Sequence, residues 1–242
     1  MVDNILTMIK VIELPIDKDM GGLTSYVLQL YRMIDKKEFE LTLLSYDDPQ
    51  NFDVNYKVET VSRPYHIIQF YKKMKCLLSE GKDIIHFHQS YVNIIPILIA
   101  KLAGFKTIIL HAHSSSIDDN RRIVRFLKTG LHKVGRFLLP YLVDIYIGCS
   151  TKASEWMFPR KCIDSDSYYL LHNAIDLDLY DRNINLGLEI RQKFNIPKDA
   201  LVVGHIGRFT PVKNHPFIID IFKEVLKQNP NSYLFLLGDG VE

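Results

Sequence analysis

The stretch GRFTPVKN, residues 207–214, decides the fold of this chain because it joins an apolar strand to an amphipathic helix. Residues 200–206 (ALVVGHI) form a β-branched run that alternates poorly, as a strand buried in a parallel sheet does. Residues 216–226 place an apolar stripe along one helical face. Residues 232–240 (SYLFLLGDG) then give a second strand with a glycine exit, so the segment predicts a strand–helix–strand crossover.

Two cations, Arg208 and Lys213, follow the first of these strands, at the edge where open α/β sheets bind ligands. A helix start beside two cations suits a phosphate or diphosphate, because its N–H groups and its dipole favour anions. A loop with solvated cations would explain either residue alone. The full order is more specific: Gly-Arg-x4-Lys-Asn, a helix, a strand and Gly-Asp-Gly.

This order resembles the nucleotide-diphosphate-sugar motif of family-4 retaining glycosyltransferases, which have the two-domain GT-B fold. The resemblance implies that Arg208 and Lys213 hold the donor diphosphate, in a cleft between two Rossmann-like domains. It is strongest toward bacterial capsular or exopolysaccharide enzymes. We therefore expect sugar transfer from a nucleotide diphosphate-sugar to a lipid-linked or other oligosaccharide, with retention of configuration. Further segments carry the resemblance: the Gly21-Gly22 loop and residues 83–88, 111–113, 149–151 and 172–176.

The composition is that of an ordinary globular protein, with 242 residues, 47% hydrophobic, 24% charged and a formal net charge of +2. This balance gives no sign of a nucleic-acid partner. Cys76, Cys149 and Cys162 form neither a CxxC pair nor a disulfide frame, which fits a reducing cytoplasm. We find neither a signal-peptide pattern nor an apolar run of about 18 residues. We expect a cytoplasmic protein, peripheral on the inner membrane face.

Strands and helices alternate along the chain, which predicts a mostly parallel, doubly wound α/β sheet of GT-B type with helices on both faces. The predicted strands span residues 5–14, 39–45, 56–61, 81–87, 106–111, 143–149, 168–171, 200–206 and 232–240. The predicted helices span residues 22–33, 65–79, 93–103, 121–139, 151–158, 187–194 and 216–226.

A domain boundary is predicted just before residue 172, ahead of a polar linker at residues 177–186. Residues 1–171 would form an acceptor-side Rossmann-like domain, and residues 172–242 the linker and an incomplete nucleotide-sugar-binding domain. Beyond the linker lies about a third of the roughly 150 residues such a domain takes. The resemblance also implies a Glu-x7-Glu motif and a final helix, and neither occurs before Glu242. We therefore expect a chain shortened by truncation or a split gene, whose own activity is in question.

Gly21 and Gly22 follow the first predicted strand and open a helix. Glycines there let the backbone approach a ligand closely, with N–H groups available at the helix start. An ordinary turn between a strand and a helix has the same pattern. The resemblance implies contact with the donor diphosphate or the acceptor, and we adopt that interpretation for the diphosphate.

His111 and His113 end a predicted strand two residues apart, so both point to one face of the sheet. Histidines bonded to backbone carbonyls at a strand end would show the same pattern. The resemblance implies that the second histidine contacts the donor sugar beside the reacting carbon. We therefore predict His113, and not His111, as the catalytic residue.

His86 and His88 repeat this spacing on the preceding strand, so four imidazoles together raise the possibility of a transition-metal site. Such a site would also need a carboxylate, and the acids close in sequence are Asp118 and Asp119. The resemblance implies transfer without a metal, because the two cations of residues 207–214 and the glycine amides would neutralise the departing diphosphate. We expect no metal and no other cofactor.

Residues 121–139 (RRIVRFLKTGLHKVGRFLL) form a strongly amphipathic helix. Its apolar face comprises Ile123, Phe126, Leu127, Leu131, Val134, Phe137 and Leu138. Its opposite face comprises Arg121, Arg122, Arg125, Lys128, Lys133 and Arg136, with no acid within the segment. A surface helix packed on the sheet explains the apolar face but not six uncompensated cations. We expect the cations to bind an anionic membrane surface or a phosphorylated lipid acceptor.

Two other functions stay open at this point. A nucleotide-sugar epimerase shares the GT-B architecture but needs carboxylate groups for acid and base catalysis. A metal-dependent hydrolase would instead use the paired histidines around a bound ion.

Overall fold

The computed structural model describes residues 8–17, 21–48, 52, 56–117, 119, 121–177 and 184–240. The chain forms two compact units, Met1–Ile175 and Asp176–Glu242. The first unit contains a seven-stranded sheet, and the second contains a two-stranded sheet.

The sheet of the first unit is parallel throughout, in the order β3-β2-β1-β4-β5-β6-β7. The chain runs outward from β1 to β3 on one side and from β4 to β7 on the other. The junction of β1 and β4 is therefore the topological switch point, beside which such sheets bind ligands. The strands are β1 (Ile9–Ile16), β2 (Phe39–Ser45), β3 (Val58–Thr60), β4 (Ile84–Gln89), β5 (Thr107–Ala112), β6 (Ile145–Gly148) and β7 (Tyr168–Leu170).

Helices cover both faces of this sheet, as the doubly wound pattern predicts. On one face, α1 packs Val27 and Leu28 against Ile16 and Leu43. On the other face a larger core includes Phe70 from α2, together with buried residues of α3 and the strands. The helices are α1 (Gly22–Met33), α2 (Ile67–Ser79), α3 (Ile94–Ala103), α4 (Arg122–Leu142), α5 (Thr151–Met157) and α6 (Arg160–Ile163).

Local sequence explains several helix ends. The Asn93 side chain caps α3 by accepting a hydrogen bond from the Ile95 amide at 3.3 Å. Gly104 ends the same helix with a φ of 107°, a left-handed conformation that glycine adopts without strain. The Ser150 hydroxyl caps α5 by accepting from the Ala153 amide at 3.2 Å.

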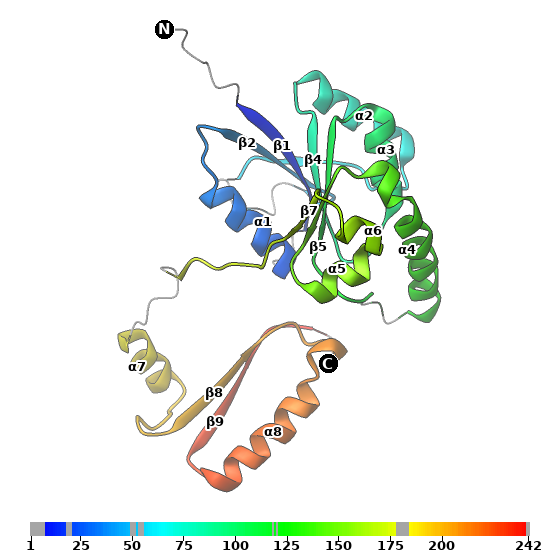
Figure 1. The fold of residues 1–242 in the computed structure, drawn as a ribbon. Helices are drawn as coiled ribbons and strands as arrows, with labels where there is room; N and C mark the ends of the chain where they lie inside the picture. The colour runs from blue at the N-terminus through cyan, green and yellow to red at the C-terminus, as the bar shows by residue number, and fades with distance from the viewer. Residues whose placement is uncertain are drawn as a thin grey trace. The chain divides into compact units, whose positions relative to one another are not determined.

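The second unit contains the predicted crossover. β8 (Leu201–Ile206) and β9 (Ser232–Leu237) pair in parallel, and α8 (His215–Gln228) connects them after a short 3-10 turn at Pro211–Lys213 (Figure 1). The prediction that β8 is buried is wrong for the described residues, since all six of its residues are exposed or half-buried. Many apolar side chains of this unit are exposed, among them Leu201, Ile206, Phe217 and Leu237.

The predicted apolar face of α8 and the predicted linker also need correction. Ile218, Phe222 and Val225 are half-buried, whereas Phe217 and Ile221 are exposed. α7 (Ile184–Lys193) begins inside the predicted polar linker, and residues 178–183 of that linker lie outside the described part of the chain.

α4 packs on the first unit through a face that overlaps the predicted one only in part, since Leu131 and Leu138 are the predicted residues that pack against the core. Its buried residues are His132, Gly135 and Leu139. A Cβ atom at Gly135 would lie 2.4 Å from Val92 Cγ1, so the helix approaches the β4–α3 loop at a residue without a side chain. Much of the predicted apolar face is exposed: Ile123 (77%), Phe126 (77%), Leu127 (64%), Val134 (59%) and Phe137 (72%). Among the described residues, no helix combines the length and hydropathy needed to cross a bilayer.

The prediction of six uncompensated cations on α4 is also wrong. The Asp119 carboxylate lies 3.1 Å from Arg121 Nε and 2.8 Å from Lys128 Nζ. Hydrogen bonds from these two cations hold the pKa of Asp119 well below its usual range. Arg136 Nη2 donates to the carbonyl oxygen of Phe158 at 2.8 Å. Asp119 precedes the helix, so the composition of the helix alone did not reveal the pairing.

The other three cations of this face remain available. Arg122, Arg125 and Lys133 are exposed, and none has an ion-pair partner within the described ranges.

Two glycines of α4 test its packing. Gly135→Ala should lower the free energy of unfolding by about 1–3 kcal/mol, because the new methyl overlaps Val92. Gly130→Ala is the matched control, since a Cβ there meets nothing within 4 Å. It should raise the free energy of unfolding by about 0.5–1 kcal/mol through helix propensity. Urea denaturation measures both, and equal stabilisation by the two variants would contradict the packing of α4.

Candidate active site

Five ionisable side chains gather on one face of the sheet, near the carboxyl ends of β1, β4 and β5. The strand register places Glu13 beside His86 and His88 beside His111. His113 follows β5 by one residue, and its amide donates to the carbonyl oxygen of Gln89 at 3.0 Å. The structure thus brings both predicted histidine pairs together. It adds the carboxylate of Glu13, which comes from β1, one of the two strands at the switch point.

Hydrogen bonds link three of these side chains in a row, which we call the Glu13–His88–His113 chain. Glu13 Oε2 lies 2.6 Å from His88 Nε2, and His88 Nδ1 lies 2.9 Å from His113 Nε2. Glu13 Oε2 is also 3.0 Å from His86 Nδ1. Glu13 and His88 are almost wholly buried, at 2% and 1% exposed.

Burial and pairing set the charges of the side chains in the Glu13–His88–His113 chain. Burial alone would raise the pKa of Glu13, but attraction to His86 and hydrogen bonds from His86 and His88 hold that pKa well below its usual range. Burial lowers the pKa of His88 to about 4, despite its bond to Glu13. Burial and neighbouring histidines also lower the pKa of His113. Near neutral pH, an ionised Glu13 therefore faces a neutral His88 and a neutral His113.

His111 lies deeper than His113. It is fully buried, and neither of its ring nitrogens has a hydrogen-bond partner among the residues that the structure describes. Burial and the nearby His113 and His88 lower the pKa of His111. The Tyr26 ring of α1 covers the group, with its centroid 5.2 Å from both His111 and His113.

A metal is a weaker explanation of the cluster than hydrogen bonding. Ligand atoms of His86, His88 and His111 lie within 4.8 Å of one another. Both nitrogens of His88, however, already bond to Glu13 and His113. The 2.6 Å between His88 and Glu13 is shorter than the roughly 3.3 Å that separates two ligands of a tetrahedral zinc ion.

Of the two carboxylates considered from the sequence, Asp119 does not join this cluster. Asp118 lies outside the described residues, and Asp119 pairs with two cations of α4 and its approach. The carboxylate of the cluster is Glu13 instead, and the sequence analysis missed it. Its one indication was a lone acid within the apolar strand IKVIELPI of residues 9–16.

The predicted glycine loop lies at the start of α1, the helix that carries Tyr26. Gly21 caps α1 in an extended conformation, and the Asp17 amide and carbonyl both bond the Thr24 hydroxyl, at 3.1 and 3.3 Å. A Cβ at Gly22 would meet nothing within 4 Å. Packing against the described residues therefore does not require glycine at residue 22.

Arg208 and Lys213, the cations predicted to bind the diphosphate, lie in the second unit, on the loop that follows β8. Backbone hydrogen bonds tie this loop to the end of β9 and to the residues after it: the Gly207 amide donates to the carbonyl oxygen of Leu237, and the Phe209 amide to that of Asp239. A Cβ at Gly238 would lie 2.0 Å from the Gly207 carbonyl oxygen, which explains a glycine of the Gly-Asp-Gly sequence.

Neither cation of this loop is neutralised. Lys213 extends along Gly207, with its Cε 3.4 Å from the position of a Cβ there. Arg208 is exposed. Neither Arg208 nor Lys213 has an ion-pair partner in the part of the chain that the structure describes. Two unpaired cations at the carboxyl end of a parallel strand form a suitable site for an anion.

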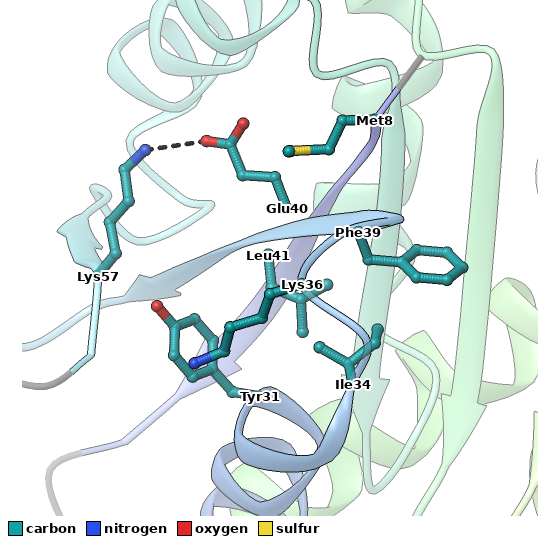
Figure 2. A pocket seen from close by; sticks show the side chains of 8 residues that line it. All are labelled: Met8, Tyr31, Ile34, Lys36, Phe39, Glu40, Leu41 and Lys57. Carbon is teal, nitrogen blue, oxygen red and sulfur yellow. Dashed lines mark hydrogen bonds and ion pairs between the residues drawn. The ribbon is translucent and has the colours of Figure 1, made fainter. Parts of the chain in front are cut away.

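A pocket of about 170 Å³ lies elsewhere in the first unit, where β1 and β2 begin (Figure 2). Its lining includes Met8, Tyr31 and Phe39, and the ion pair between Lys57 and Glu40 borders it at 3.1 Å. These residues lie at the amino ends of the strands, opposite to the histidine cluster. We assign it no role, because ligands of such sheets bind at the carboxyl ends.

Comparison with known proteins identifies relatives of this chain. The sequence profile of Glycosyltransferase Family 4 matches residues 20–179. A putative glycosyltransferase, EpsF, of Bacillus subtilis is 25% identical over 238 residues, covering 91% of this chain and 59% of EpsF. A UDP-Gal:alpha-D-GlcNAc-diphosphoundecaprenol alpha-1,3-galactosyltransferase of Escherichia coli is 22% identical over 241 residues, with the same coverage. The chain thus spans 59% of the length of both relatives.

Solved structures share the fold. Anabaena HepE in complex with UDP-glucose has a TM-score of 0.69 at 16% identity, covering 95% of this chain and 60% of HepE. A putative UDP-N-acetylglucosamine 2-epimerase of Listeria monocytogenes has a TM-score of 0.53 at 16% identity, covering 95% of this chain and 62% of the epimerase. At these identities the likeness establishes the α/β fold of GT-B type.

The buried histidines should make stability depend on pH. Their folded pKa values are lowered, so the unfolded chain binds more protons below about pH 6.5, and stability falls as the pH falls. Each such histidine contributes a slope of up to about 1.4 kcal/mol per pH unit. His111→Leu should remove one of these contributions without lowering stability at pH 7, because it removes two unpaired buried nitrogens. Denaturation between pH 7 and pH 5 measures this, and an unchanged slope would contradict it.

Proposed function

The chain belongs to glycosyltransferase family 4, and on that premise we propose that it acts on a nucleotide diphosphate-sugar. The sugar would pass to a hydroxyl of a lipid-linked or other oligosaccharide, with retention of configuration, in the synthesis of a bacterial surface polysaccharide. The observation that carries the donor assignment is the unpaired couple Arg208 and Lys213 on the loop after β8.

Electrostatics support this role for the two cations. The diphosphate gains negative charge as its bond to the sugar breaks, and preorganised cations and amides stabilise that charge without having to reorient. The ties to the end of β9 and to the residues after it hold the Arg208 loop in place before any ligand binds. HepE was solved with UDP-glucose, and the E. coli relative is named for transfer from UDP-Gal, which supports a donor of this class.

We assign the remaining contacts of the donor to the first unit. Gly21 and Gly22 would offer backbone amides to the diphosphate, at the start of α1. His113 would be the catalytic residue, contacting the sugar. The family match favours transfer over epimerisation, although an epimerase shares the fold.

The acceptor proposal rests on the name of the E. coli relative, whose substrate is a diphosphoundecaprenol. An enzyme that uses a lipid-linked acceptor gains from attachment to the membrane that holds it. We propose that α4 provides the attachment, through its exposed apolar face and the cations Arg122, Arg125 and Lys133. Apolar side chains would enter the interface while the cations contact anionic head groups, on the cytoplasmic leaflet.

Donor binding can be measured on the chain as it is. Arg208→Ala should weaken the calorimetric affinity for UDP by about tenfold or more, because a charge-assisted hydrogen bond is worth roughly 1.5–3 kcal/mol. Lys223→Ala is the matched control, since Lys223 is an exposed cation of the same unit that pairs with Asp220 at 2.7 Å. Equal affinities of the Arg208 variant and the wild type would remove the donor assignment.

Membrane attachment should need both features of α4. Cosedimentation with anionic vesicles should fall strongly for Phe126→Ser combined with Phe137→Ser, which removes apolar contact. It should also fall for Arg122→Glu combined with Arg125→Glu, because each cation near the surface contributes about 1 kcal/mol. Binding of the wild type should weaken as salt rises.

The control carries the same change of charge at a distant surface. Lys36→Glu combined with Lys37→Glu alters two exposed cations near the start of β2 and should bind vesicles like the wild type. Failure of the wild type to bind, or equal loss in this control, would remove α4 as the attachment site.

A further inference from the structure

We propose that Glu13 and His88 are positioning residues that fix the tautomer of His113, so that its free ring nitrogen accepts a hydrogen bond from a sugar hydroxyl. The inference rests on the proposed function, in which His113 contacts the donor sugar. It adds two residues from other strands and states the chemistry of the group that His113 recognises.

Glu13 sets the direction of the hydrogen bonds in the Glu13–His88–His113 chain. An ionised carboxylate can only accept hydrogen bonds, so the hydrogen between Glu13 Oε2 and His88 Nε2 belongs to His88. A neutral imidazole carries one N–H, and His88 uses it here. Its other nitrogen, Nδ1, must therefore be an acceptor.

The second bond then fixes His113. His88 Nδ1 lies 2.9 Å from His113 Nε2, and since Nδ1 accepts, His113 Nε2 must donate. The single hydrogen of a neutral His113 is thus on Nε2, and Nδ1 keeps its lone pair. Packing of the Tyr26 ring and the bond from the His113 amide to Gln89 hold the residue in place.

This tautomer selects the ligand chemistry. A lone pair on Nδ1 matches a hydroxyl, which can donate a hydrogen bond, and repels a phosphate oxygen, which can only accept. The diphosphate would therefore bind the cations Arg208 and Lys213, and His113 would bind the sugar. The negative charge of Glu13 acts through the hydrogen bonds of His88 and makes Nδ1 of His113 a stronger acceptor. A carboxylate has the same effect on a metal-bound histidine.

Nuclear magnetic resonance of the histidine-labelled wild-type chain tests the direction without any ligand. A hydrogen bond between two ring nitrogens gives a scalar coupling across the bond. We expect a proton attached to His113 Nε2 that shows coupling to His88 Nδ1. A proton attached to His88 Nδ1, or metal coordination of His88 in the purified chain, would overturn the proposal.

Two variants of His88 test the consequence for the sugar. UDP-glucose should bind the wild type more tightly than UDP does, through the sugar. His88→Leu cannot accept from His113 and should lose that difference, about three- to tenfold for one hydrogen bond, while UDP affinity stays unchanged. His88→Gln can both donate to Glu13 and accept from His113, and should keep the difference.

The outcomes separate this inference from the proposed function. If the wild type binds neither UDP nor UDP-glucose, the donor assignment fails, and the resonance experiment still decides the tautomer. If His88→Leu keeps the full difference in affinity between UDP-glucose and UDP, the proposed role of the Glu13–His88–His113 chain in sugar recognition is wrong. Loss of UDP affinity in His88→Leu would indicate a general structural role and would also overturn the proposal.

Discussion

The buried carboxylate of Glu13 is the constraint on which the active-site end of the first unit depends. An ionised group that is 2% exposed requires hydrogen-bond donors, and two histidines of the neighbouring strand supply them. The parallel register of β1 and β4 brings these groups side by side. The same register places this polar group at the switch point, where a doubly wound sheet offers space for a ligand.

The second unit shows a similar principle in its backbone. Amides of the Arg208 loop bond to carbonyls at and after the end of β9, so the two cations are held by main-chain geometry rather than by ion pairs. Side chains that lack partners in the protein are free to bind an anion. Under the proposed function, the unpaired cations of this loop would bind the diphosphate, and the lone pair of His113 would bind the sugar.

The sequence predicted the bounds of helices and strands well where interactions between neighbouring residues decide them. α1 and β2 have the bounds predicted, and α3 starts after Asn93 and ends before Gly104, because a side-chain cap and a left-handed glycine act within a few residues. The family motif placed Arg208 and Lys213 on the loop after β8, and the structure shows them there. The sequence analysis did not identify Glu13 as a site residue, because no neighbouring residue shows which histidines of the next strand lie beside it.

The sequence by itself determined the order of the strands and of the described α-helices other than the short α6, the parallel α/β class and, through its motifs, the family. Periodicity, turn residues and short motifs are properties of neighbouring positions. The tertiary structure alone decided which face of α4 packs: Gly135 comes close to Val92, a residue far from it in sequence, while much of the apolar stripe stays exposed. It also decided which cations of that helix remain free, and it joined Glu13 to His88 and His113. Each of these depends on residues far apart in the chain, whose distance is set by the packing of whole strands and helices.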